Sequence, residues 1–255
     1  MSADEAPAKD DKGVVTAGQP SAWNIRDAAW AVCLELGLFA LLCNITYLFT
    51  GLVDTVRGLP WNTHAGVSTS PVPLAATARA ISGLAVAWLA TRLFRVSWSA
   101  FGIKRPSSGI LWPIGFTAAI AFAYVGGGAL LLYQAPDFVE SLTPRSAIST
   151  MGFWWVLTGF CIAAPIGEEV IYRGILYKPL RNRLGVWKAI VISAAVFAVM
   201  HNLLSFTLFL PWTQFAGGLI FAYAYEKTDS LLYPVLYHAC GNALLFVAYA
   251  LLLGT

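Results

Sequence analysis

Apolar segments of membrane-spanning length determine what this chain can fold into. A spanning helix needs about 20 mostly apolar residues. Candidates lie at about 28–53, 74–95, 110–133, 148–178, 187–206, 213–226 and 231–253. Only 11% of the residues are charged, whereas a soluble domain carries about 25%. The sequence therefore predicts an all-α, polytopic transmembrane helix bundle of about seven spanning helices, or eight, forming a single domain over residues 23–255.

The polar residues outside these apolar segments indicate what precedes and what surrounds the bundle. Residues 1–22 are small, polar and proline-containing, which predicts a disordered N-terminal tail, and no signal peptide is visible. Basic residues lie in short clusters between apolar runs and not along one helical face, so we expect a lipid bilayer and no nucleic acid as a partner.

The distribution of Lys and Arg predicts an orientation. Two connections are basic, with Arg92, Arg95, Lys104 and Arg105 in one and Lys178, Arg181, Arg183 and Lys188 in the other. The connection between the third and fourth spans carries Asp137, Glu140 and a single basic residue, Arg145. Because cytoplasmic loops are enriched in Lys and Arg, we expect an integral protein of the plasma membrane with a cytoplasmic N-terminus.

Two adjacent glutamates, Glu168 and Glu169, follow a run without charges in the fourth span. A carboxylate at membrane depth is costly unless it is paired or faces water, which makes both candidates for a functional site. Glu169 has Arg173 four residues later, the spacing of a helical ion pair, whereas Glu168 has Tyr172 there and no cation. This indicates a structural role for Glu169 and a general base in Glu168; a purely structural Glu–Arg cluster is the alternative.

Two further spans carry histidines at helical spacing from a second side chain. Phe197 and His201 share one helix face, and alone such a histidine is more often a packing residue than a ligand. His238 and Asn242 also share a face and could form an oxyanion hole, or an interhelical hydrogen-bonding pair. At 1.5 Å per residue, Glu168, His201 and His238 lie roughly 15, 20 and 10 Å from the cytoplasmic side. The sequence therefore predicts one shared site, whereas Glu35 in the first span needs a partner or cavity and is expected to be structural.

Together these motifs resemble the CPBP family, also called the Abi or CAAX-protease group of intramembrane endopeptidases, whose motifs are EExxxR, FxxxH and HxxxN or HxxxB. Here they run from Glu168 to Arg173, from Phe197 to His201 and from His238 to Asn242, within a motif core at about 150–246.

The resemblance implies a glutamate-activated water. Glu168 activates it, His201 assists as acid and base, His238 and Asn242 stabilise the oxyanion, and Glu169 and Arg173 support the site. It implies a peptide or membrane-anchored protein substrate, such as a prenylated C-terminus, a leader peptide or a membrane-anchored regulator.

Three alternatives stay open. Glu168, His201 and His238 could instead supply a His2Glu zinc site. HExxH is absent, and we favour no metal and no cofactor. A non-catalytic immunity or scaffold protein would keep the polar cluster for packing alone. A transporter would use its buried carboxylates to relay protons.

Overall fold

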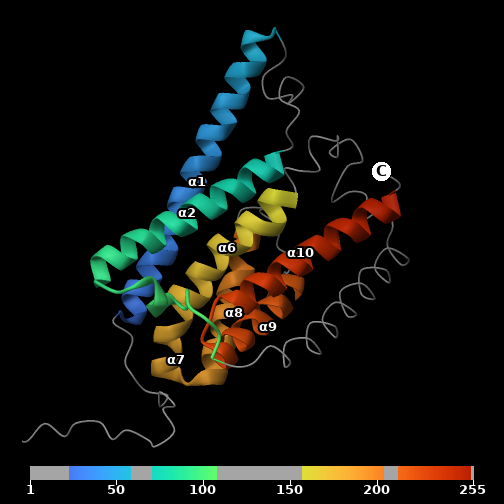
Figure 1. Ribbon diagram of the computed structural model, residues 1–255. Helices are drawn as coiled ribbons and strands as arrows, with labels where there is room; N and C mark the ends of the chain where they lie inside the picture. Colours follow the sequence, from blue (N-terminus) through green and yellow to red (C-terminus); the bar gives the residue numbers. More distant parts are fainter. Residues whose placement is uncertain (1–22, 59–70, 108–156, 204–211, 254–255) are drawn as a thin grey trace, which may run out of the picture.

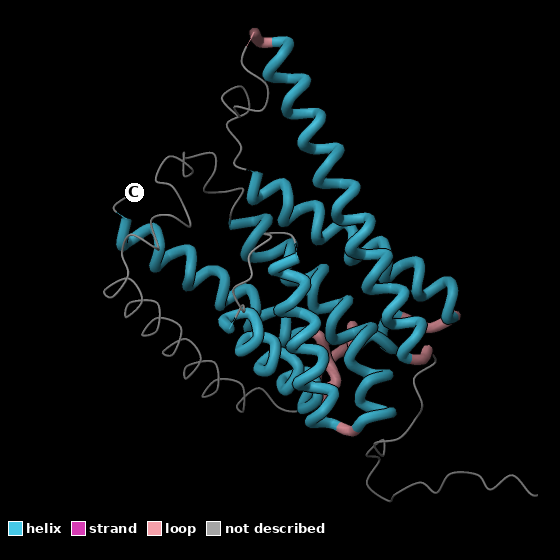
Figure 2. The backbone as a smooth tube through the Cα atoms, turned by 180° about the vertical axis from the view of Figure 1, so that it is seen from behind, coloured by secondary structure: helices cyan, strands magenta, loops and turns pink. Residues whose placement is uncertain are grey.

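The computed structural model describes residues 23–58, 71–107, 157–203 and 212–253. Within these ranges every regular element is helical, as Figures 1 and 2 show. The elements are α1 (Ile25–Val56), α2 (Pro71–Phe94), the 3-10 turn η1 (Trp98–Phe101), the π-helical η3 (Gly159–Ala163), α6 (Ala164–Glu169), the π-helical η4 (Val170–Tyr177), α7 (Lys178–Leu184), α8 (Val186–Leu203), α9 (Trp212–Thr228) and α10 (Leu232–Leu253). The all-α class is confirmed for these residues.

The observed helices begin and end within one turn of the predicted bounds, with one exception. The fourth segment was predicted to end at Lys178, but the chain stays helical to Leu184. The prediction was wrong there because it followed hydropathy, whereas polar residues continue a helix when they find partners: Arg181 pairs with Glu226 at 2.7 Å. The predicted third span, the start of the fourth and the tail at 1–22 lie outside the described residues.

The first helix has a well-formed start. The Asn24 side chain accepts hydrogen bonds from the backbone N–H of Arg26 and Asp27, and Asp27 accepts one from the Asn24 backbone, which completes a capping box. Just before it, the buried indole of Trp23 donates to the Ile175 carbonyl at 2.7 Å. The beginning of α1 is thereby fixed beside η4.

The helix that carries the glutamates is irregular on both sides of α6. The π-helical turns of η3 and η4 flank it, and Pro165, which has no N–H to donate, stands in its first turn. A π turn widens the helix and is frequent at functional sites. Glu168 and Glu169 end the short α6 between these irregular turns, and both are buried in the interior of the bundle.

Glycines let the backbones of two helix pairs approach closely. A Cβ built on Gly83 of α2 would lie 2.5 Å from the Gly167 carbonyl oxygen of α6, and one on Gly167 would lie 2.8 Å from Ala80 Cα. Likewise a Cβ on Gly218 of α9 would lie 3.0 Å from Ala194 of α8. Small residues are typical of such contacts between helices in membranes. The first contact holds α2 directly against the segment with both glutamates.

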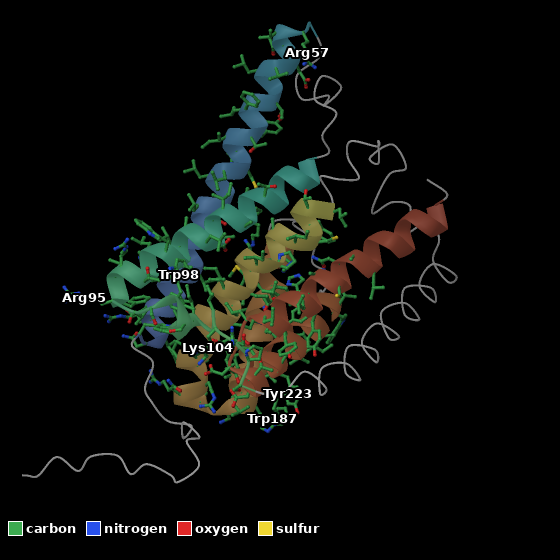
Figure 3. The ribbon with its side chains drawn as sticks, viewed as in Figure 1. Arg57, Arg95, Trp98, Lys104, Trp187 and Tyr223 are labelled. Carbon is green, nitrogen blue, oxygen red and sulfur yellow. The ribbon has the colours of Figure 1, made fainter. Side chains whose placement is uncertain are left out.

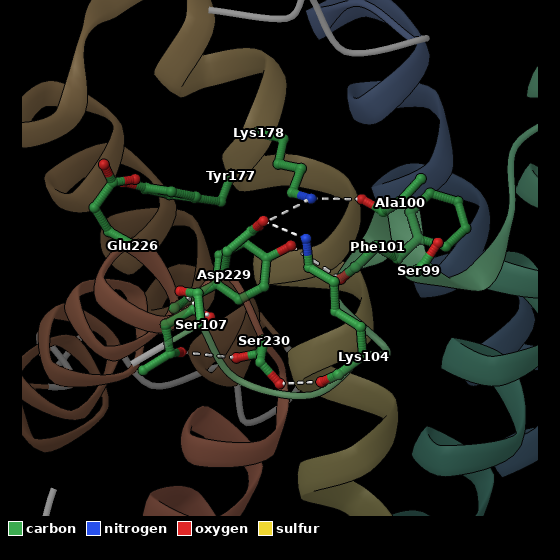
Figure 4. Close-up of polar contacts among 12 residues, drawn as sticks. Ser99, Ala100, Phe101, Lys104, Ser107, Tyr177, Lys178, Glu226, Asp229 and Ser230 are labelled. Atoms are coloured by element: carbon green, nitrogen blue, oxygen red, sulfur yellow. Dashed lines mark hydrogen bonds and ion pairs between the residues drawn. The ribbon is translucent and has the colours of Figure 1, made fainter. Parts of the chain in front are cut away.

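Several connections meet at one end of the bundle, shown in close-up in Figure 4. The Lys178 ammonium donates to the Ala100 carbonyl at 2.6 Å, and the Leu231 N–H donates to the Gly102 carbonyl at 2.8 Å. Lys104 pairs with Asp229 in the turn between α9 and α10. The two basic connections identified in the sequence therefore share one end, as the alternating topology predicts.

The far half of α1 extends beyond the other described helices (Figures 1 and 2). Its large apolar side chains are exposed there, with Leu48 59%, Phe49 63% and Val56 80% accessible. Within the described residues, α1 is the helix whose length and composition allow it to cross a membrane, and the run Val186–His201 is apolar but shorter.

Candidate active site

Side chains from three helices meet around one carboxylate. Glu168 Oε2, on α6, lies 3.6 Å from His201 Nε2 on α8 and 3.7 Å from His238 Nε2 on α10. The predicted convergence of these three residues is therefore confirmed. The side chains of Glu168 and His238 are each 8% exposed, whereas that of His201 is 27% exposed. The site is thus most accessible on the His201 side.

Hydrogen bonds fix the orientation of the two imidazole rings. His201 Nδ1 lies 2.8 Å from the Phe197 carbonyl oxygen, and His238 Nδ1 lies 2.9 Å from Glu169 Oε1. Both partners can only accept, so each Nδ1 carries the proton. The Nε2 of a neutral ring then directs its lone pair at Glu168 Oε2, which accepts no hydrogen bond from the described residues. This buried oxygen and the two ring nitrogens are suited to bind one water molecule and accept its protons.

The second glutamate forms the predicted ion pair. Arg173 Nε lies 3.1 Å from Glu169 Oε2, Arg173 Nη1 donates to Glu169 Oε1, and both side chains are fully buried. Arg173 Nη2 donates to the Gly218 carbonyl at 3.1 Å, which ties the pair to α9. Because Glu169 also accepts from His238, it both neutralises Arg173 and sets the ring orientation of His238.

Two phenylalanines form the apolar wall of the site. The Phe221 ring stacks on the His238 imidazole at 4.8 Å between centroids, and the Phe197 ring lies 4.4 Å from that of His201. The Arg173 guanidinium lies 4.6 Å from the centre of Phe197 and 5.3 Å from that of Phe221. These rings exclude water from the Glu169–Arg173 pair and restrict the imidazoles to one orientation.

Asn242 lies on the same helix as His238, but its described contact is different. Its Nδ2 donates to the Phe160 carbonyl at 2.8 Å, in the π-helical turn η3. The amide thus joins α10 to the irregular helix that carries Glu168. One of its two N–H groups is engaged there, and the other has no acceptor among the residues that the structure describes.

Sequence reasoning missed Arg79, on α2. Its Nε lies 3.4 Å from Glu168 Oε1, its Nη1 lies 3.3 Å from Glu35 Oε2, and its Nη2 donates to the Tyr172 hydroxyl at 2.6 Å. The sequence places no cation four residues after Glu168 on its own helix, and the cation that Glu168 contacts comes from another helix instead.

A signal was present in the sequence. Arg79 and Glu35 are ionisable residues inside predicted spans, and such residues pair with one another. The expectation that Glu35 needs a partner is confirmed, since it pairs with Arg79 and accepts a hydrogen bond from Ser82 at 2.7 Å.

The donor set was also compared with a metal centre. In the described part of the chain, no group of three or more His, Cys, Asp and Glu side chains is arranged to hold a metal ion. The Arg79 guanidinium also stands against Glu168, on its Oε1. The zinc alternative, with Glu168, His201 and His238 as ligands, stays a hypothesis.

Comparison with known proteins places these motifs in a family. Residues 150–244 match the model of the Rce1-like family, described as type II CAAX prenyl endopeptidase Rce1-like. A protein of Escherichia coli described as an uncharacterized 24.3 kDa protein is 32% identical over 136 residues, which cover 51% of this chain and 59% of that relative. No solved structure matches the chain.

The matched segment contains all three motifs, whereas α1 and α2 lie outside it. The motifs, their convergence in space and the family match agree with one another. The match at residues 150–244 supports assigning this segment to the CPBP, CAAX protease-like family.

Proposed function

We propose that this protein is an intramembrane endopeptidase in which Glu168 activates a water molecule. One observation carries the proposal: the buried Oε2 of Glu168 accepts no hydrogen bond from the described residues and faces the Nε2 atoms of His201 and His238. A buried carboxylate with one oxygen left for a water molecule is an arrangement suited to general-base catalysis.

The chemistry follows from the positions of these groups. Glu168 Oε2 takes a proton from the bound water, and the oxygen attacks the carbonyl carbon of the peptide bond. The resulting tetrahedral intermediate collapses when the carbon–nitrogen bond breaks. His201 relays the abstracted proton to the leaving amine, since its ring is the more exposed of the two and its Nε2 faces Glu168. The products are an amine and a carboxylic acid, which loses the second proton of the water to solvent, and the site returns to its starting protonation.

The proposed oxyanion hole uses His238 and Asn242. Because His238 Nδ1–H is donated to Glu169, its Nε2 can donate to an oxyanion only when the ring is doubly protonated. Glu168 and Glu169 lie on its two sides, 3.7 Å from Nε2 and 2.9 Å from Nδ1. Asn242 contributes the N–H that Phe160 does not use. Donors of this kind stabilise the charge that develops in the transition state.

Membrane placement is part of the same proposal. The exposed apolar side chains of α1 support contact with lipid, because soluble proteins rarely expose such patches. Figure 3 shows Trp98, Trp187 and Lys104 in the part of the bundle opposite Arg57. Aromatic and basic residues at one end are typical of the cytoplasmic membrane interface. A cysteine in place of Arg183 should therefore be protected from an impermeant thiol reagent in intact cells; ready labelling would reverse the proposed orientation.

The first substrate to test is a peptide with a farnesylated C-terminal CAAX sequence, since the matched family model describes prenyl endopeptidases. A leader peptide and a membrane-anchored regulator are the other candidates. We propose hydrolysis without a metal, supported by the Arg79 guanidinium, which already places a positive charge beside Glu168. The alternative is a zinc-dependent protease using Glu168, His201 and His238.

The test uses purified protein in detergent micelles and a quenched fluorescent, farnesylated peptide. Glu168→Gln should abolish cleavage with little change in melting temperature, because the amide cannot take a proton from water. Glu226→Gln is the matched control, as that carboxylate pairs with Arg181 at the end of the bundle.

Equal cleavage by wild type and Glu168→Gln would exclude Glu168 as the base. No cleavage by wild type of any of the three candidate substrates would favour the scaffold or transporter alternatives. A stoichiometric zinc ion that is lost in His238→Ala would favour the zinc enzyme.

A further inference from the structure

We propose that Arg79, which lies outside the segment matched by the family model, is a positioning residue that holds Glu168 in its reactive orientation. This inference rests on the proposed role of Glu168 as the base. It would make α2 a necessary part of the site, although α2 carries none of the three motifs.

Each nitrogen of the Arg79 guanidinium faces an oxygen atom of another side chain. Its Nε, Nη1 and Nη2 face Glu168, Glu35 and the Tyr172 hydroxyl respectively, at 3.4, 3.3 and 2.6 Å. The Phe39 ring packs on its face, 4.9 Å from the centroid to the central carbon, and the residue is 5% exposed. A planar fork with fixed partners at each nitrogen loses little freedom when it binds a carboxylate and orients it firmly.

This contact assigns different tasks to the two oxygens of Glu168. Arg79 lies against Oε1, whereas Oε2 faces His201 and His238. Without the cation, rotation of the carboxylate about its last bond would no longer be opposed on the Oε1 side, and Oε2 would leave the water position for part of the time. Misplacement of a reacting group by about 1 Å can reduce the rate about 10²-fold.

Stability alone is a poor explanation for the charges at this place. Buried ion pairs contribute little to folding when compared with apolar residues of similar volume, because both charges lose their hydration. The interior instead contains the carboxylates of Glu35, Glu168 and Glu169 and the guanidiniums of Arg79 and Arg173. Arg173 forms an ion pair with Glu169, whereas the Arg79 guanidinium faces Glu168.

The close contact between α2 and α6 is what brings Arg79 into reach. Gly83 and Gly167 allow their backbones to touch, and Arg79 lies one turn before Gly83, as Glu168 lies directly after Gly167. The distance from α2 to the catalytic carboxylate is thus set by backbone contact and not by adaptable side chains.

The experiment separates positioning from stability. Arg79→Gln should lower kcat about 10²-fold with little change in KM, and should lower the melting temperature because two buried carboxylates lose their cation. The double variant Glu35→Gln/Arg79→Gln removes one of these carboxylates, so its melting temperature should recover while kcat stays low. Arg79→Lys keeps the charge and should restore part of kcat. Arg181→Gln, which removes a guanidinium at the end of the bundle, should leave kcat unchanged and serves as the control.

Recovery of kcat together with melting temperature in the double variant would overturn the positioning role. Failure of the proposed function has different signatures, which are equal cleavage by wild type and Glu168→Gln or no cleavage by wild type. The contact between Arg79 and Glu168 is then tested by a measurement that needs no turnover. The melting temperatures of Arg79→Gln, Glu168→Gln and the variant with both changes are compared. Additive losses would show that the two side chains do not interact, and would refute the positioning role as well.

Discussion

Two groups of charged side chains in this protein use the same chemistry in different surroundings. The interior cluster consists of Glu35, Arg79, Glu168, Glu169 and Arg173, all of them buried. The end cluster consists of Lys104, Lys178 and Asp229, whose side chains are 38%, 21% and 48% exposed. Both contain carboxylates within ion-pair distance of cations. Their expected contributions to the free energy of unfolding nevertheless differ several-fold, because water reaches only the end cluster.

The difference in exposure to water determines what each cluster can do. In the end cluster, water and salt screen the charges, so losing a partner costs little and the contacts mainly connect loops. In the interior cluster, an unpaired charge has no water to solvate it, so every member depends on the others. That dependence makes the interior suitable for holding groups in fixed positions.

The largest effect should follow from removing the central interior cation. Arg173→Met leaves Glu169 buried without its partner and removes the hydrogen bond to Gly218, so we expect a loss of about 3–5 kcal/mol of unfolding free energy. The double variant Glu169→Gln/Arg173→Met should recover a large part of it. Thermal unfolding in detergent measures both. A single variant as stable as wild type would mean that water reaches Glu169 and that the two clusters do not differ.

A smaller effect should follow from separating α2 and α6. Gly167→Ala adds a Cβ that would lie 2.8 Å from Ala80 Cα and the Arg79 carbonyl oxygen, so the helices must move apart. Overpacking of this kind costs about 1–3 kcal/mol, and here it should also lower kcat by drawing Arg79 away from Glu168.

Gly37→Ala on α1 is the matched control, because nothing lies within 4 Å of the added Cβ. It should be neutral or slightly stabilising, since alanine favours helix formation over glycine. If Gly167→Ala behaved in the same way, the backbone contact would not be what sets the position of Arg79.

The smallest effect should come from the end cluster. Asp229→Asn should cost at most about 1 kcal/mol of unfolding free energy and less at high salt. Asn is the suitable replacement because Asp229 has a positive φ of 46°, which Asn tolerates. Measurement by thermal unfolding at low and high salt tests the screening directly; a loss as large as that of Arg173→Met would remove the distinction between the clusters.

The contribution of Asp229 to stability depends on pH with a defined sign. Burial opposes ionisation of Asp229, but hydrogen bonds and charges from Lys104 and Lys178 outweigh it and hold the pKa below the ordinary value of 3.8. A lowered folded-state pKa contributes stability that is present above the unfolded pKa and lost as pH falls through the folded one. Wild type and Asp229→Asn should therefore differ at neutral pH and converge in acid.

The sequence predicted much of the described fold, because hydrophobic run length alone places long apolar helices. The motif spacing also predicted the Glu169–Arg173 pair and the meeting of Glu168, His201 and His238, since depth along each helix could be counted from the basic connections. It did not predict the π-helical turns around α6, which depend on how neighbouring helices pack. It placed the end of the fourth helix too early, because Arg181 finds its partner on α9.

What the sequence by itself determined is the helical class, the positions of most helices and the three motifs, all of which follow from local composition and spacing. What only the tertiary structure decided is which side chains meet across helices. Examples are Arg79 with Glu168, His238 with Glu169, and Asn242 with the Phe160 carbonyl. The physical reason is that pairing within a helix is fixed by its 3.6-residue period, whereas pairing between helices depends on their rotation and separation. Here backbone contacts such as that between Gly83 and Gly167 set both.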